Sequence, residues 1–189
     1  MILMKDIIRE GHPNLTKVSK DVRMPISEED KILGFNLLKY CVFSQNAELA
    51  EKHGLRPGVG LSAVQVNVLK RMFAMHLEDL DGQMFSMIIV NPVITHKSKE
   101  MIYLNGGEGC LSIDRKTEGL TPRHKRITFS AHIFDFKENK FLRKTMRLKD
   151  YPAIVFQHEY DHLDGILYID KLFKELKDAK PLIEIEENE

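Results

Sequence analysis

The sequence predicts an α+β fold in which antiparallel and mixed β-sheets surround one central buried helix. Four short runs with the apolar, β-branched pattern of strands occupy residues 72–77, 87–95, 125–134 and 141–148. A later segment, residues 151–163, has helical spacing and an apolar first half. Because a helix that is apolar all round lies inside a protein core, this segment is expected to be the central helix.

Two further helices are expected before the strands. The first covers residues 27–41, because Ser27 and the three acidic residues after it form a capping pattern and apolar residues then recur at helical spacing. A second helical stretch, residues 45–53, ends at Gly54. The segment 55–60 that follows has the Gly and Pro content of a loop.

Local chemistry also predicts the borders of the later elements. Every second residue of the run 125–134 is apolar, so this strand is expected to bury one face. Asp150 is expected to cap the central helix and Gly165 to end it. A charged surface helix is expected over residues 171–180, and residues from about 184 to 189 form an acidic tail.

Composition narrows the range of functions. The chain has 189 residues and is 43% hydrophobic, which suits one compact domain spanning residues 1–189. Lys and Arg total 28 and so do Asp and Glu, so composition predicts no strong field toward nucleic acid or an anionic membrane. The N-terminus has no apolar stretch long enough for a signal peptide or a membrane span, which predicts a cytoplasmic location. A structural disulfide between Cys41 and Cys110 is not expected there.

Residues 158–162 read His-Glu-Tyr-Asp-His, an HExxH motif on the expected central helix. The spacing places His158 and His162 on one face, one turn apart, where both can bind one cation. A cation lowers the pKa of a bound water, and the Glu159 carboxylate beside it can take the proton. If these were ordinary core residues, the cost of burying their polar groups in an apolar helix would be unexplained. The motif therefore favours a water-activating metal site.

A catalytic metal usually has three protein ligands, so a third must come from elsewhere. The spacing of metzincin proteases points to Tyr168, which does not match their third histidine, and that of thermolysin-like proteases points to Glu184 in the acidic tail. Cys110 is a better candidate, because it stands among glycines that let the backbone approach closely and a thiolate binds borderline cations well. Cys41 has no such neighbours and is interpreted as a packing residue.

Three segments resemble, in their order and spacing, the three signatures of the peptide deformylase family. They read GVGLSAVQ at residues 58–65, EGCLS at residues 108–112 and QHEYDH at residues 157–162. The interval between the first two signatures is similar to the longer-insert class of many Gram-positive bacteria. The resemblance implies a metal-dependent hydrolase that removes the formyl group from the N-terminal formylmethionine of newly made proteins and releases formate.

The resemblance also implies roles for individual residues. The metal ligands would be Cys110, His158 and His162, with water as the fourth. Glu159 would be the general acid and base, and the Gln65 side-chain amide and the Leu111 backbone N–H would stabilise the developing oxyanion. Family members in bacteria commonly use Fe²⁺, but Zn²⁺, Ni²⁺ or Co²⁺ would suit the same ligands.

The implied substrates are N-formylmethionyl peptides and nascent chains, with the ribosome as a further candidate partner. The apolar pocket for the methionine side chain would be formed by Val59, Leu111, Ile154 and Val155. The extended loop 58–61, which contains Gly60, would form backbone hydrogen bonds with the peptide in the manner of an added strand.

Two residues depart from the usual first signature, GxGLAAxQ, which often has Pro before the Gln. Ser62 replaces the first Ala and Val64 the Pro. A buried serine needs a hydrogen-bond partner, and the missing proline predicts a looser loop around Gln65. These departures are the only support for one alternative, a binding protein of deformylase ancestry without turnover. The other alternative is a metalloprotease that uses HExxH without Cys110.

Overall fold

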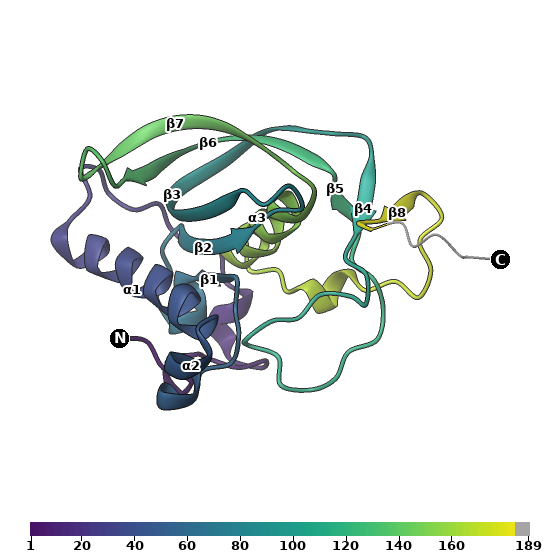
Figure 1. Ribbon diagram of the computed structural model, residues 1–189, viewed down its shortest axis with the longest axis horizontal. Coiled ribbons are helices and arrows are strands. Elements are labelled where there is room, and N and C mark those ends of the chain that lie inside the picture. Colours follow the sequence, from purple (N-terminus) through teal and green to yellow (C-terminus); the bar gives the residue numbers. More distant parts are fainter. Residues whose placement is uncertain (184–189) are drawn as a thin grey trace.

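The computed structural model describes residues 1–183, in which a large curved sheet and a small sheet combine with three α-helices (Figure 1). The large sheet is antiparallel, in the order β1-β2-β3-β6-β7. Its strands are β1 (Gly60–Ser62), β2 (Met72–Glu78), β3 (Met84–Lys97), β6 (Arg126–Asp135) and β7 (Lys140–Lys149). The small sheet is mixed, because β4 pairs antiparallel with β5 and parallel with β8. Its strands are β4 (Met101–Tyr103), β5 (Arg123–His124) and β8 (Ala179–Pro181). The expected α+β class is confirmed.

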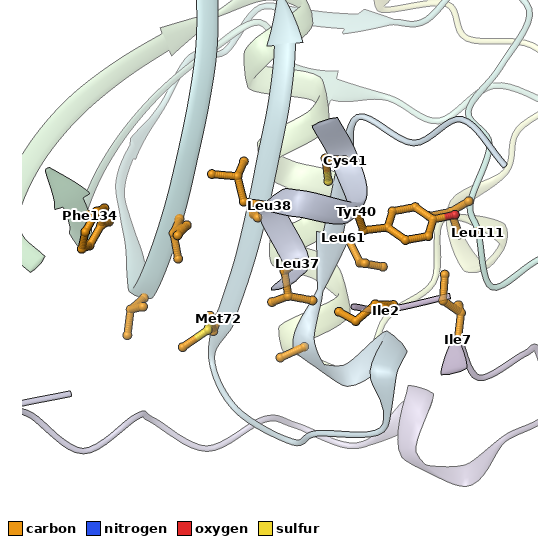
Figure 2. Packing of buried hydrophobic residues seen from close by; sticks show 14 of the residues in the cluster. Ile2, Ile7, Leu37, Leu38, Tyr40, Cys41, Leu61, Met72, Leu111 and Phe134 are labelled. Atoms are coloured by element: carbon orange, nitrogen blue, oxygen red, sulfur yellow. The ribbon is translucent and has the colours of Figure 1, made fainter. Parts of the chain in front are cut away.

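The two long helices, α1 (Glu28–Ser44) and α3 (Asp150–Leu163), cover opposite faces of the large sheet. Met72 of β2 belongs to the apolar cluster under α1, whereas the next residue, Phe73, belongs to the cluster under α3. Successive strand residues point to opposite faces, so the two clusters lie on either side of the sheet. Figure 2 shows the α1 side, where Leu37 points toward Met72.

Helix α3 runs through the core, as its apolar first half predicts. Residues 152–157 are all buried, and Gly165 follows the helix in the left-handed region with φ 72°. The expected cap was wrong, because Lys149 occupies the N-cap position and makes no side-chain capping bond. Strand β7 continues to Lys149, and α3 follows without a loop residue between them, because the chain turns sharply at Asp150, whose φ of 54° lies in the left-handed region.

The N-terminal helices also match the expectation. Ser27 Oγ accepts a hydrogen bond from Asp30 N at 3.2 Å at the start of α1. Helix α2 (Ala47–His53) is capped by Asn46 and ends at Gly54 with φ 60°. In strand β6 the expected apolar face is buried; its residues are Ile127, Phe129, Ala131 and Ile133.

The surface helix expected over residues 171–180 was wrong. A short 3-10 helix, η4 (Tyr168–Lys171), ends where that helix was expected to begin, and strand β8 then pairs with β4. Pairing with β4, which is distant in sequence, thus outweighs the helical preference of the local sequence. Three other 3-10 helices were not foreseen: η1 (Met4–Asp6), η2 (Pro13–Thr16) and η3 (Ala63–Val66).

The remaining expectations concern the tail, the membrane and Cys41. The expected tail, residues 184–189, and with it Glu184, lies outside the described residues. Over residues 1–183 no helix combines the length and the apolar character needed to cross a bilayer. Cys41 is a free thiol, fully buried in the cluster under α1, which confirms that it is a packing residue.

The close approach of α1 to the sheet depends on Gly34. A Cβ added there would lie 2.6 Å from Ile88 Cγ2. We expect Gly34→Val to lower the free energy of unfolding by about 1–3 kcal/mol, because overpacking outweighs a helix-propensity gain of less than about 0.5 kcal/mol. Ile32→Val, at an exposed position of the same helix, is the control and should change stability by about 0.5 kcal/mol or less. Urea denaturation measures both, and equal stabilities of the two variants would contradict this packing argument.

Candidate metal centre and active site

A cysteine and two histidines from distant segments meet beside helix α3. Cys110 lies in the long connection between β4 and β5, whereas His158 and His162 lie one turn apart on α3. The ligand atoms of the three side chains all lie within 4.8 Å of one another, and Cys110 Sγ is 3.4 Å from His162 Nε2. The structure therefore brings together the three residues expected to bind a metal.

The surroundings of these side chains fit a divalent metal ion. His158 Nδ1 is 2.7 Å from Glu108 Oε2, so the carboxylate accepts the Nδ1 hydrogen and leaves Nε2 available as a ligand. His162 Nδ1 is buried and has no hydrogen-bond partner among residues 1–183, while Nε2 faces the sulfur of Cys110. One sulfur and two imidazole nitrogens form a donor set that iron, zinc, nickel and cobalt all accept.

A buried ion-pair network fixes the position of His158. The Arg123 guanidinium, 3% exposed, donates to both carboxylate oxygens of Glu108 at 2.7 and 2.9 Å and also contacts Asp161. Burial alone would raise the pKa of Glu108, but hydrogen bonds from Arg123 and His158 outweigh it and lower this pKa to about 2. Glu108 is therefore a carboxylate throughout the neutral range, and it lies two residues before Cys110, so the network links both sides of the metal site.

Sequence analysis missed the roles of Glu108 and Arg123. Glu108 belongs to the second signature, but no local pattern tells that it faces a histidine of α3. Arg123 lies in a strand of only two residues, β5, which also escaped prediction. A buried arginine needs a carboxylate partner, but only the folded structure shows that Arg123 is buried.

Glu159 is buried against strand β1. The Ser62 hydroxyl lies 2.7 Å from Glu159 Oε2 and 3.0 Å from the Glu159 carbonyl oxygen. A Cβ at Gly60 would lie 2.4 Å from Glu159 Oε1, so the carboxylate fits only because this residue is glycine. Burial raises the pKa of Glu159, which moves it toward the range of a general base at neutral pH. The hydrogen-bond partner that a buried Ser62 requires is thus Glu159.

The side-chain amide of Gln65, on the 3-10 helix η3, lies beside Cys110. Gln65 Nε2 is 3.4 Å from Cys110 Sγ and 3.2 Å from Ser112 Oγ, while its Oε1 accepts a hydrogen bond from Ser62 N at 2.9 Å. Gln65 is 1% exposed, so these contacts hold its orientation although Val64 replaces the usual proline. The Leu111 backbone N–H has no acceptor within the described part of the chain.

These groups line a single pocket of about 350 Å³. Its wall includes the residues expected to bind the substrate, which are Val59, Gly60, Leu111, Ile154 and Val155. Cys110, His158, Glu159 and Gln65 face the same pocket. Sequence analysis did not foresee other parts of the wall, among them Gln45, Arg56, Leu104 and Tyr151. One cavity therefore combines an apolar lining with the metal-binding set.

Comparison with known proteins agrees with this site. Residues 4–178 match the polypeptide deformylase family. Peptide deformylase 2 of Geobacillus stearothermophilus is 51% identical over 172 residues, which cover 91% of this chain and 91% of that protein. The peptide deformylase of Oceanobacillus iheyensis is 49% identical over 172 residues, with the same coverage of 91% for both chains. Both organisms are Gram-positive bacteria, as the long interval between the first two signatures predicts.

A solved structure supports the same assignment. The probable peptide deformylase of Synechococcus phage S-SSM7 is 30% identical and superposes with a TM-score of 0.68, covering 88% of this chain and 98% of that one. The family match and these relatives span most of the sequence, including all three signatures. The chain therefore belongs to the polypeptide deformylase family, metal-dependent hydrolases that remove the N-formyl group from newly made polypeptides.

Proposed function

We propose that Cys110, His158 and His162 hold one divalent metal ion, Fe²⁺ in the cell, and that the adjoining pocket binds N-formylmethionyl peptides. The convergence of these three ligands beside Glu159 is the observation that carries the proposal. A bound ion of this kind lowers the pKa of water and polarises a carbonyl oxygen. With ferrous iron bound to the Cys110 thiolate, the site would be sensitive to oxygen, because the sulfur is readily oxidised.

Glu159 moves the proton in the proposed reaction. Its carboxylate takes a proton from the water that attacks the formyl carbon, and it then gives this proton to the leaving amine, so that formate and a free N-terminus result. The raised pKa of Glu159, caused by burial, suits a group that must both accept and return a proton. The Ser62 hydroxyl and the bare backbone at Gly60 keep the carboxylate in place.

Gln65 and Leu111 stabilise the negative charge that develops on the formyl oxygen. The Gln65 amide is held beside Cys110 by contacts on both its nitrogen and its oxygen, so it needs no reorientation during the reaction. The backbone N–H of Leu111, without a protein acceptor among residues 1–183, is available as a second donor.

The apolar part of the pocket selects the methionine side chain. Val59, Leu111, Ile154 and Val155 supply its lining, and none of them carries a polar side-chain atom. Strand β1 lies at the edge of the large sheet, so the segment around Gly60 offers unpaired backbone groups to an extended peptide. Ser62 gives no support to a binding protein without turnover, since its hydroxyl holds Glu159 in place.

The first experiment measures formate release from formyl-Met-Ala under anaerobic conditions. Release is expected to stop when the metal is removed by a chelator and to return when Fe²⁺ is added, because the ligands are otherwise intact. Elemental analysis of protein purified anaerobically should find iron. Full restoration by Zn²⁺ but not by Fe²⁺ would reject iron, and cleavage of internal peptide bonds would favour the metalloprotease alternative.

Glu159→Gln tests the proton transfer in the same assay. We expect turnover to fall about 10²- to 10⁴-fold with the metal content unchanged, because glutamine keeps an acceptor for Ser62 but cannot take a proton. A fully active Glu159→Gln variant would refute the mechanism.

Gln65→Ala tests the oxyanion contact. We expect kcat to fall about 10²- to 10³-fold with little change in KM, because the lost hydrogen bond forms in the transition state. Gln45→Ala is the matched control, because this second pocket amide is bound to the carbonyl oxygens of Gly58 and His76. The kcat of this control should stay near that of the unaltered protein. Equal losses of kcat in the two variants would contradict the proposed role of Gln65 in stabilising the oxyanion.

We also propose that the chain meets its substrates in the cytoplasm, on nascent polypeptides at the ribosome. A formylated N-terminus occurs on new chains, and the pocket accepts a terminus that is still attached to a longer polypeptide. Sedimentation through a sucrose cushion should find the protein with translating ribosomes. Its absence from the ribosome pellet at low salt would contradict this proposal.

A further inference from the structure

The outward face of strands β6 and β7 is rich in cations, although the whole chain has no net charge. Every charged residue of β7 is basic. Arg143, Arg147 and Lys149 are exposed, whereas the residues between Arg147 and Lys149 and on either side of Arg143 are less so. Because strand residues alternate between faces, these three cations lie on the face of the sheet opposite helix α3, where α1 packs mainly on β1, β2 and β3 and leaves this part of β7 exposed.

The pairing with β6 and β3 places one further arginine and two histidines beside this row of cations. Arg143 lies opposite His132, Lys149 lies opposite Arg126, and Thr128 has Arg147 on one side and His96 of β3 on the other. We call this surface the basic sheet face, and its members are His96, Arg126, His132, Arg143, Arg147 and Lys149. In Figure 1, β6 and β7 run along the upper boundary of the molecule.

Carboxylates neutralise two of the four Arg and Lys side chains on this face. Arg126 pairs with Glu100 at 2.9 Å and Lys149 pairs with Asp81 at 2.9 Å. Arg143 and Arg147 have no carboxylate partner anywhere in residues 1–183. A free guanidinium binds phosphate oxygens with two parallel hydrogen bonds, so this pair of arginines suits a polyanion with phosphate groups.

The shape of the face and its neighbours also suit a nucleic acid strand. The row from Arg143 to Lys149 is about 20 Å long at the rise of an extended strand, enough for several nucleotides. At the Lys149 end, the surface deepens into a groove of about 950 Å³. Four basic side chains line it, with one acidic residue among them, Asp79; the four are Lys99, Arg126, Arg147 and Lys149. Beyond the Arg143 end lies Phe136, which is 56% exposed. Cations beside exposed aromatic rings bind single strands through their phosphates and bases.

We propose that the basic sheet face binds the sugar-phosphate backbone of RNA without reading its sequence. The hydroxyl groups of Thr128 and Thr145 lie between the cations and can donate to phosphate oxygens, as side chains at nucleic-acid interfaces do. Within this face the exposed apolar side chain is Val93 of β3, 54% exposed and opposite Ser130, and one small side chain offers little area for insertion into a bilayer. The face is distinct from the deformylase pocket, because the two share no lining residue.

Fluorescence anisotropy with a labelled uridylate strand of about 20 nucleotides tests the proposal. Binding is expected at ~50 mM salt and should weaken steeply toward ~200 mM, because phosphate contacts release counterions. The double variant Arg143→Glu/Arg147→Glu should weaken binding about tenfold or more. Its formate release should equal that of the unaltered protein, which shows that the variant is folded.

The control is Lys52→Glu/Lys177→Glu, which changes the net charge equally but lies outside the basic sheet face. Its affinity for RNA should fall about twofold or less. Equal losses in the two double variants would overturn the proposal, because net charge alone would then explain binding. Undetectable RNA binding by the unaltered protein would also overturn it. So would Arg143- and Arg147-dependent binding to phosphatidylserine vesicles in the absence of RNA binding.

Discussion

The buried contact of Arg123 with Glu108 is the interaction on which the rest of the site depends. Both side chains are almost fully enclosed, and a buried charge is tolerated only when a partner of opposite sign and further hydrogen bonds compensate its lost hydration. Glu108 uses one of the same carboxylate oxygens to hold His158, so the ion pair also orients a proposed metal ligand. The same backbone segment carries both Glu108 and Cys110, so this network links the loop that supplies the sulfur to the helix that supplies the two histidines.

The connection between β4 and β5 illustrates why such a network is needed. It contains no helix or strand, and a long irregular segment has few backbone hydrogen bonds to fix its shape. Side chains replace them: Arg56 donates to Asp114 and reaches the carbonyl oxygens of Cys110 and Ile113. The segment that carries Cys110 is therefore held by polar contacts from two sides, whereas His158 and His162, the other proposed ligands, are held by the regular backbone of α3.

Sequence alone predicts those features of this protein that are determined by residues close together in the chain. The apolar first half of α3, the HExxH spacing and the alternation in β6 are each contained in a few consecutive residues, and the structure agrees with them. The elements that escaped prediction, such as β5 and β8, exist because a distant strand pairs with them. The role of Arg123 was missed for the same reason. Cys110 could be selected from the sequence on chemical grounds, but only the folded structure shows that it lies beside His158 and His162 of α3.

Protection of the sheet edge is a simpler explanation for the charges on β7, since edge strands commonly carry charged residues that prevent pairing with another chain. Edge protection explains why β7 is charged, but a mixture of acidic and basic side chains would protect the edge equally well. It also does not extend to β6, an interior strand whose outward positions include Arg126 and His132. A single sign of charge that crosses from an edge strand to its neighbour, with Arg143 and Arg147 left unpaired among the described residues, is the arrangement that a polyanionic partner requires.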